Sequence, residues 1–67
     1  MTIEEFVKLR DYIYRKVGIY FDEKKLYYVE KRVEARMRSI GVDSFRAYFA
    51  WMRFDTSGRE LQELLNA

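Results

Sequence analysis

The sequence predicts an all-α fold, a compact four-helix bundle with three main helices and a short C-terminal helix. Apolar residues recur every three or four positions along most of the 67-residue chain, as they do in helices that bury one face. No stretch shows the apolar–polar alternation of a strand, and the chain has no Asn-Gly or Asp-Gly hairpin turn. Gly18 and Gly41 each follow a long periodic stretch, where left-handed glycines commonly end helices.

The first helix is predicted over residues 3–17. Thr2 followed by Glu5 is typical of a capping box, in which each side chain accepts a hydrogen bond from the other residue's backbone N–H. Gly18 ends this helix, and the Ile-Tyr-Phe segment 19–21 joins it to the next one. The apolar side chains of that segment are expected to dock on the core. The apolar positions of the helix itself are Ile3, Phe6, Val7, Leu9, Ile13, Tyr14 and Val17.

The second helix is predicted over residues 23–40 and is the longest of the four. Asp22 is expected to be its N-cap, because a carboxylate there accepts from a free backbone N–H of the first turn. Its core side is an apolar stripe that covers about 80° of a helical wheel drawn at about 100° per residue. The stripe consists of Leu26, Val29, Val33, Met37 and Ile40.

The third helix is predicted over residues 44–54, with Asp43 as its N-cap. Its apolar face consists of Phe45, Tyr48, Phe49 and Met52. A second capping box, Ser57 with Glu60, is expected to open a short fourth helix that carries Leu61, Leu64 and Leu65. This helix has an opening signal but no stop signal, so the chain is expected to be the N-terminal piece of a longer protein.

The whole net charge of +2 belongs to the second helix. Residues 22–41 hold six cations and four anions, while the rest of the chain holds seven of each. The cations lie opposite the core stripe together with Tyr28 and Ala35, over about 27 Å of helix at 1.5 Å per residue. They are Lys24, Lys25, Lys31, Arg32, Arg36 and Arg38. The acidic residues gather on one shoulder beside Tyr27, at Glu23, Glu30 and Glu34.

This segregation favours a binding face over an ordinary solvated face, because neighbouring like charges repel one another without local relief. The helix dipole accounts for Arg36 and Arg38 near the C-terminal end but disfavours Lys24 and Lys25 in the first turn. The favoured partner is a protein helix that carries a stripe of Glu and Asp. A free-standing module that binds nucleic acid or another polyanion is the alternative, although the small net charge and the acidic shoulder make nucleic acid the weaker candidate.

Composition restricts the chemistry that this chain can perform. It contains no histidine and no cysteine, which excludes an imidazole base, a thiol nucleophile and a His/Cys metal site. No catalytic, cofactor-binding or metal-binding residue is predicted in it. No apolar run approaches the roughly 20 residues of a membrane span, and no signal-peptide pattern is present.

The segment from Gly18 to Gly41, GIYFDEKKLYYVEKRVEARMRSIG, resembles the N-terminal domain of the CheR chemoreceptor methyltransferases. The family pattern is a Gly-Ile turn, a lysine and a run of arginines that ends near a glycine. Residues 42–45, Val-Asp-Ser-Phe, with Tyr48 match the next helix of the family. Residues 60–67 are similar to its last helix before a Thr-x-Asn-x-Thr-x-Phe-Phe-Arg motif. The resemblance covers nearly the whole chain, and its residues on the second helix are Lys25, Arg32, Arg36 and Arg38.

The resemblance implies that residues 1–67 are the N-terminal domain of a two-domain cytoplasmic enzyme. Such enzymes use S-adenosylmethionine to methylate glutamate side chains on the cytoplasmic helices of methyl-accepting chemotaxis receptors. The cofactor and the catalytic residues would belong to a following catalytic domain, which is the second implied partner. The fragment alone would then be catalytically silent, while its second helix would offer positive charge to the acidic receptor helices.

Carried over by position, the residues expected to contact the receptor are Lys25, Lys31, Arg32, Arg36 and Arg38. Ala35 departs from the family pattern, since many relatives have a basic residue there, and the register on the receptor is therefore open. Arg32 is expected to be exposed, so that Arg32→Ala would change the free energy of unfolding by no more than about 0.5 kcal/mol.

Overall fold

The computed structural model describes residues 1–66 and confirms the all-α fold, because these residues form helices and no strand. A single turn of 3₁₀-helix leads into the second α-helix. The elements are α1 (Ile3–Val17), η1 (Glu23–Lys25), α2 (Leu26–Ile40), α3 (Phe45–Phe54) and α4 (Arg59–Asn66).

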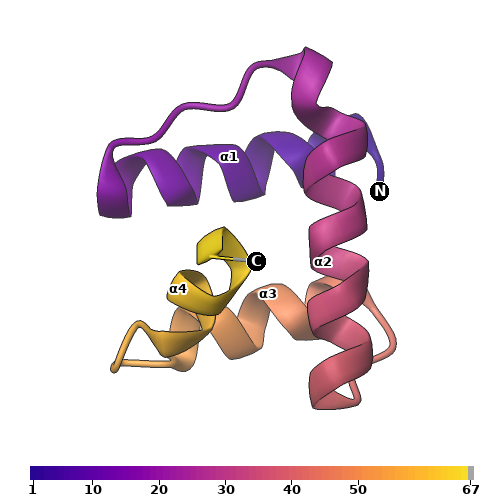
Figure 1. Cartoon of the computed structure of the whole chain (residues 1–67), viewed down its shortest axis with the longest axis vertical. Coiled ribbons are helices and arrows are strands. Elements are labelled where there is room, and N and C mark those ends of the chain that lie inside the picture. Colours follow the sequence, from indigo (N-terminus) through magenta and orange to yellow (C-terminus); the bar gives the residue numbers. More distant parts are fainter. Residues whose placement is uncertain (67) are drawn as a thin grey trace.

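The four helices enclose one core. In Figure 1, α1 and α3 run in the same direction, away from α2, and α2 crosses the ends of both. The short helix α4 lies between α1 and α3 in this view. The innermost side chains come from all four helices and are Phe6, Leu9, Ile13, Val29, Val33, Tyr48, Met52, Leu61 and Leu64.

The two ends of α1 follow the predicted capping pattern. Thr2 Oγ1 accepts a hydrogen bond from the backbone N–H of Glu5 at 3.1 Å, and Glu5 Oε1 accepts from the N–H of Thr2 at 2.9 Å. Gly18 ends the helix in the left-handed region with φ of 77°. A residue with a Cβ would be strained at that φ, and glycine therefore ends the helix without cost.

The predicted second helix is confirmed at Asp22, but Asp22 caps η1, and the α-helix itself starts later without a side-chain cap. Asp22 accepts from the backbone N–H of Lys24 at 2.9 Å, as predicted. The residues Glu23–Lys25 form a 3₁₀ turn, and the α-helix begins only at Leu26. The predicted apolar stripe does face the core, because Val29 and Val33 are buried. Leu26, Met37 and Ile40 are partly buried and pack against it.

The predicted N-cap of α3 is wrong by one residue. Ser44, with extended φ and ψ, lies directly before the helix, and its side chain accepts from the N–H of Ala47 at 3.2 Å. Asp43 is one position too early to reach that free N–H, and its side chain is exposed. The helix therefore begins at Phe45 with a serine cap.

The predicted capping box of α4 is also wrong. The backbone N–H of Glu60 donates to Asp55 Oδ2 at 2.8 Å, while Ser57 Oγ accepts from the N–H of Arg59 at 3.2 Å. Hydrogen bonds from Ser57 and from the Glu60 backbone hold the pKa of Asp55 below its ordinary value. Glu60 does not reach back to Ser57, because its side chain points into the protein and is buried.

The linker between α1 and η1 docks on the core through one residue only. Phe21 packs against the core cluster, but Ile19 and Tyr20 remain 44% and 59% exposed. The Tyr20 ring instead packs edge-on against Tyr14, with ring centroids 5.8 Å apart. The expectation that all three apolar side chains of residues 19–21 dock on the core is therefore wrong for two of them.

Candidate functional site

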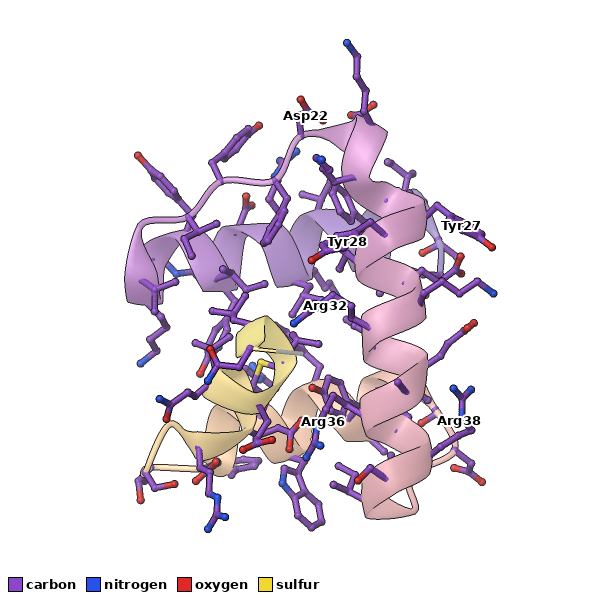
Figure 2. All side chains as sticks on the ribbon, viewed as in Figure 1. Asp22, Tyr27, Tyr28, Arg32, Arg36 and Arg38 are labelled. Atoms are coloured by element: carbon purple, nitrogen blue, oxygen red, sulfur yellow. The ribbon has the colours of Figure 1, made fainter. Side chains whose placement is uncertain are left out.

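The cations of η1 and α2 differ in their surroundings. Lys24 of η1 and Lys31 and Arg38 of α2 are exposed and form what we call the outer row, and Lys25 of η1 is exposed next to it. Arg32 and Arg36, the inner pair, are partly buried. Figure 2 shows both arginines of the inner pair pointing toward α4, whereas Arg38 points away from it on the other side of α2.

Arg36 is bound to Glu60 of α4 in a two-pronged ion pair. Its Nε donates to Glu60 Oε2 at 2.9 Å, and its Nη2 donates to Oε1 at 2.8 Å. The Tyr48 hydroxyl also donates to Glu60 Oε2, at 2.7 Å. The Glu60 side chain is only 5% exposed, and that of Arg36 is 21% exposed. This planar pairing satisfies a carboxylate that would otherwise be costly to bury.

The three groups stabilise one another's protonation states. Burial opposes the ionisation of Glu60, but hydrogen bonds from Arg36 and Tyr48 outweigh it and hold the Glu60 pKa below its ordinary value. The hydrogen bond to Glu60 raises the pKa of Arg36. Burial, followed by the hydrogen bond to Glu60, raises the pKa of Tyr48. At neutral pH a buried carboxylate therefore neutralises Arg36, and a neutral phenol completes the cluster.

Arg32 is bound to the C-terminal end of α4. Its Nε donates to the backbone carbonyl of Leu64 at 2.8 Å, and its Nη2 donates to the same oxygen. Its Nη1 donates to the Tyr28 hydroxyl at 3.1 Å. The last turn of α4 has no basic residue of its own. Arg32 therefore supplies the positive charge that favours a helix C-terminus and satisfies one of its free carbonyls.

The outer row is engaged much less. Lys31 lies 3.6 Å from the Glu34 carboxylate and 5.1 Å from the centre of the Tyr27 ring. Electrostatic attraction to Tyr27, and to a lesser extent to the Glu34 carboxylate, raises the Lys31 pKa. Arg38 and Lys24 have no carboxylate within 4.0 Å among residues 1–66.

Lys25 is also exposed, and its ammonium lies 5.9 Å from the centre of the Tyr28 ring. On the acidic shoulder, Glu30 pairs with the N-terminal ammonium of Met1. Glu30 is thus paired with the N-terminus and Glu34 with Lys31, while Lys24, Lys25 and Arg38 are exposed cations with no carboxylate within 4.0 Å among residues 1–66.

Comparison with known proteins identifies the family of this chain. The family described as "CheR methyltransferase, all-alpha domain" matches residues 4–67. The chain belongs to this CheR family. It is 45% identical over all of its 67 residues to chemotaxis protein methyltransferase 2 of Vibrio cholerae, and it spans 23% of the length of that relative. No solved structure matches it.

Within this CheR all-alpha domain, the residues predicted to bind a partner separate into distinct environments. Lys25, Lys31 and Arg38 are exposed, while Arg32 and Arg36 are held by α4. The expectation that Arg32 and Arg36 repel each other without relief is wrong, because Glu60 neutralises Arg36. Glu60 was missed as its partner. One signal was available, since Glu60 precedes Leu64 by four positions and so lies on the apolar face of α4.

A metal-binding cluster and a membrane-spanning helix are both absent from the described residues. They contain no cluster of three or more acidic, histidine or cysteine side chains that could hold a metal ion. None of the helices within residues 1–66 is both long enough and apolar enough to cross a membrane.

Proposed function

We propose that this CheR all-alpha domain is the substrate-recognition part of an S-adenosylmethionine-dependent protein-glutamate O-methyltransferase that acts on methyl-accepting chemotaxis receptors. Membership of the CheR family and the identity to a chemotaxis protein methyltransferase support this function. The chain spans about a quarter of that relative, so methyl transfer is proposed for the parent enzyme in the cytoplasm and not for this domain alone.

The hollow between α1 and α3 does not suit S-adenosylmethionine. It is lined by four cations, Lys8, Arg15, Arg46 and Arg53, against two carboxylates, Glu5 and Asp11. The cofactor's sulfonium centre is itself a cation, and like charges disfavour its binding there. We therefore place cofactor binding in a catalytic domain of the parent enzyme, which would also be a packing partner of this domain.

The observation that carries the docking proposal is the outer row of α2. Lys31 and Arg38 are seven residues apart on α2, which is about 10.5 Å at 1.5 Å per residue, and Lys24 precedes them in η1. A receptor helix with acidic side chains at the same interval presents a complementary row of charge. Such complementarity chiefly speeds association and fixes the register of the two helices.

The five residues predicted to bind the receptor enter the proposal in two roles. Lys25, Lys31 and Arg38 are exposed and are proposed to contact receptor carboxylates directly, Lys31 and Arg38 as members of the outer row and Lys25 as the neighbour of its Lys24. Arg32 and Arg36 are proposed to act as positioning residues, because their hydrogen bonds to Leu64 and Glu60 fix α4 against α2. Ala35 lies on the exposed side of α2 and leaves room for a receptor backbone to approach.

A titration followed by NMR tests this function. The ¹⁵N-labelled chain is titrated at 50 mM salt with a peptide from a receptor methylation region, and the same peptide with every Glu replaced by Gln is the control. We expect amide shifts centred on Lys25, Lys31 and Arg38 with the acidic peptide only. Shifts scattered over the other helices, or no binding, would contradict the proposal.

Duplex DNA in a parallel titration distinguishes the polyanion-binding alternative. The proposed function predicts no gel shift with DNA at 50 mM salt. Sequence-independent binding that weakens steeply with salt, with a logarithmic slope of roughly 0.9 per phosphate contact, would favour the alternative.

A further inference from the structure

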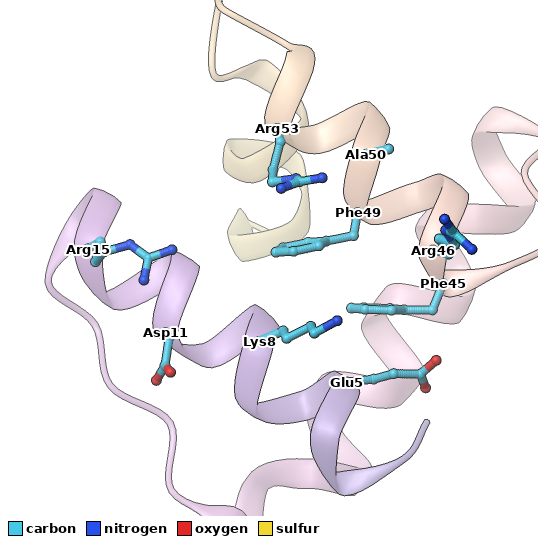
Figure 3. A pocket seen from close by; sticks show the side chains of 9 residues that line it. All are labelled: Glu5, Lys8, Asp11, Arg15, Phe45, Arg46, Phe49, Ala50 and Arg53. Carbon is cyan, nitrogen blue, oxygen red and sulfur yellow. The ribbon is translucent and has the colours of Figure 1, made fainter.

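A groove between α1 and α3 forms a second charged surface on this domain. Its volume is about 860 Å³, and its lining residues come from α1 and α3 only, so it is separate from α2 (Figure 3). Phe45 and Phe49 stack along it, with ring centroids 5.5 Å apart and ring planes 14° apart. The Arg53 guanidinium lies 5.1 Å from the centre of the Phe49 ring. This α1–α3 groove thus has an aromatic floor.

Two rows of cations border that floor. Lys8 and Arg15 lie on α1, and Arg46 and Arg53 lie on α3. Each pair is separated by seven residues, or about 10.5 Å along its helix. Because α1 and α3 run in the same direction (Figure 1), the two rows are roughly parallel.

These four cations are not neutralised by ion pairs within the described residues. None of the four lies within 4.0 Å of a carboxylate in the described part of the chain. The groove is also lined by two acidic residues, and each has another partner: Glu5 accepts from the Thr2 backbone, and Asp11 accepts from Arg10 at 3.3 Å. In Figure 3 the Asp11 carboxylate points away from the groove. The α1–α3 groove therefore presents a net positive charge to any molecule that enters it.

We propose that the α1–α3 groove binds an acidic amphipathic helix of a partner protein. The apolar stripe of that helix lies on Phe45 and Phe49, and carboxylates spaced by seven residues on both sides of the stripe meet the two cation rows. In helix-in-groove recognition an amphipathic helix lays its apolar face in an apolar groove, and the two cation rows add charge complementarity that fixes its register. A single-stranded nucleic acid fits less well, because its bases stack on free ring faces, whereas the Phe49 ring is already stacked with Phe45 and has the Arg53 guanidinium beside it.

The test uses a synthetic helical peptide with a leucine stripe flanked on both sides by glutamates at seven-residue intervals. A peptide of identical composition, with the glutamates moved to the face opposite the leucines, is the control. Binding to the 67-residue chain is measured by fluorescence anisotropy at 150 mM salt, where exposed charges interact over about 8 Å. Amide shifts of the labelled chain locate the bound peptide.

We expect the flanked peptide to bind at least tenfold more tightly than the control and to shift amides of α1 and α3. The double variant Arg46→Glu/Arg53→Glu reverses one rim and is expected to weaken binding at least tenfold. Lys8→Glu/Arg15→Glu reverses the other rim and provides an independent test if the first variant unfolds, as monitored by circular dichroism. Lys16→Glu/Arg59→Glu makes the same change of charge on exposed residues outside the groove and is expected to leave binding within twofold.

Three results would overturn the proposal. One is equal affinity for the two peptides, and another is equal loss of binding in the groove variants and in Lys16→Glu/Arg59→Glu. The third is a set of amide shifts confined to α2, which would place the peptide on the outer row. The peptide contains no receptor sequence. Failure of this test would therefore not contradict the proposal that α2 binds the receptor, which the receptor titration tests by itself.

Discussion

Arg36 of α2 and Glu60 of α4 are joined by two hydrogen bonds, of 2.9 and 2.8 Å, that use both carboxylate oxygens. Tyr48 of α3 donates to the same carboxylate at 2.7 Å. One buried acidic side chain therefore connects three helices of a 67-residue domain. The pairing also removes one cation from the charge that α2 offers to other molecules.

Replacing Arg36 should destabilise the fold. Arg36→Ala leaves the Glu60 carboxylate buried without its cation, and we expect a loss of about 2 to 3 kcal/mol in the free energy of unfolding. The matched control is Arg38→Ala, two residues along the same helix, which should change it by less than about 0.5 kcal/mol. Urea unfolding followed by circular dichroism measures both values. Equal losses in the two variants would show that the ion pair contributes nothing specific.

The ionisation of Glu60 should make stability depend on pH. Its folded-state pKa is lower than its ordinary value, so the unfolded state binds its proton first on acidification. The stabilisation is fully present well above the ordinary glutamate pKa of about 4.3, and it is lost as the pH falls through the lowered pKa. Wild type should be more stable than Glu60→Gln between pH 6 and 8, and this difference should shrink below about pH 4. Urea unfolding from pH 2.5 to 8 tests this; a difference that stays constant over the range would contradict it.

Arg32 should contribute more to stability than its place in the sequence suggests. Arg32→Ala leaves the Leu64 carbonyl at the end of α4 without its charged donor, and the expected loss is about 1.5 kcal/mol. The prediction from sequence, a change within about 0.5 kcal/mol, assumed an exposed side chain. Thermal or urea unfolding of Arg32→Ala and Arg32→Lys decides between the two values. Partial rescue by lysine is expected, since it restores the charge but not the paired geometry.

The cap of α3 gives a prediction for two adjacent residues. Ser44→Ala removes the acceptor for the Ala47 N–H and should cost about 1 kcal/mol of stability. Asp43→Ala should leave stability nearly unchanged, because the Asp43 side chain is exposed and is not the cap. The two unfolding midpoints in urea are compared directly. A larger loss of stability in Asp43→Ala than in Ser44→Ala would show that Asp43 is the N-cap, as the sequence predicts.

Local signals in the sequence were sufficient to predict the helices. Thr2, Asp22, Gly18 and Gly41 act at the positions where their chemistry indicated, since a cap depends only on residues a few positions away. Ser44 was missed because two adjacent residues are both good caps, and only the backbone shows which one precedes the first helical turn.

The inner pair could not be predicted in the same way. Arg32 and Arg36 face partners 32 and 24 residues away, so a helical wheel of α2 alone shows them as part of its polar face. Their burial depends on where α4 packs, which the sequence pattern of either helix does not specify. The wheel placed Lys31 and Arg38 on the polar side of α2, and both are exposed in the structure.

In the proposed function the outer row binds the receptor, while the inner pair, Arg32 and Arg36, holds α4 against α2. Isothermal titration calorimetry of an acidic receptor methylation-region peptide against wild type and Lys31→Ala/Arg38→Ala separates these two roles. We predict that the double variant binds at least tenfold more weakly while its unfolding midpoint in urea stays that of wild type. Unchanged affinity in a folded double variant would contradict this separation of roles.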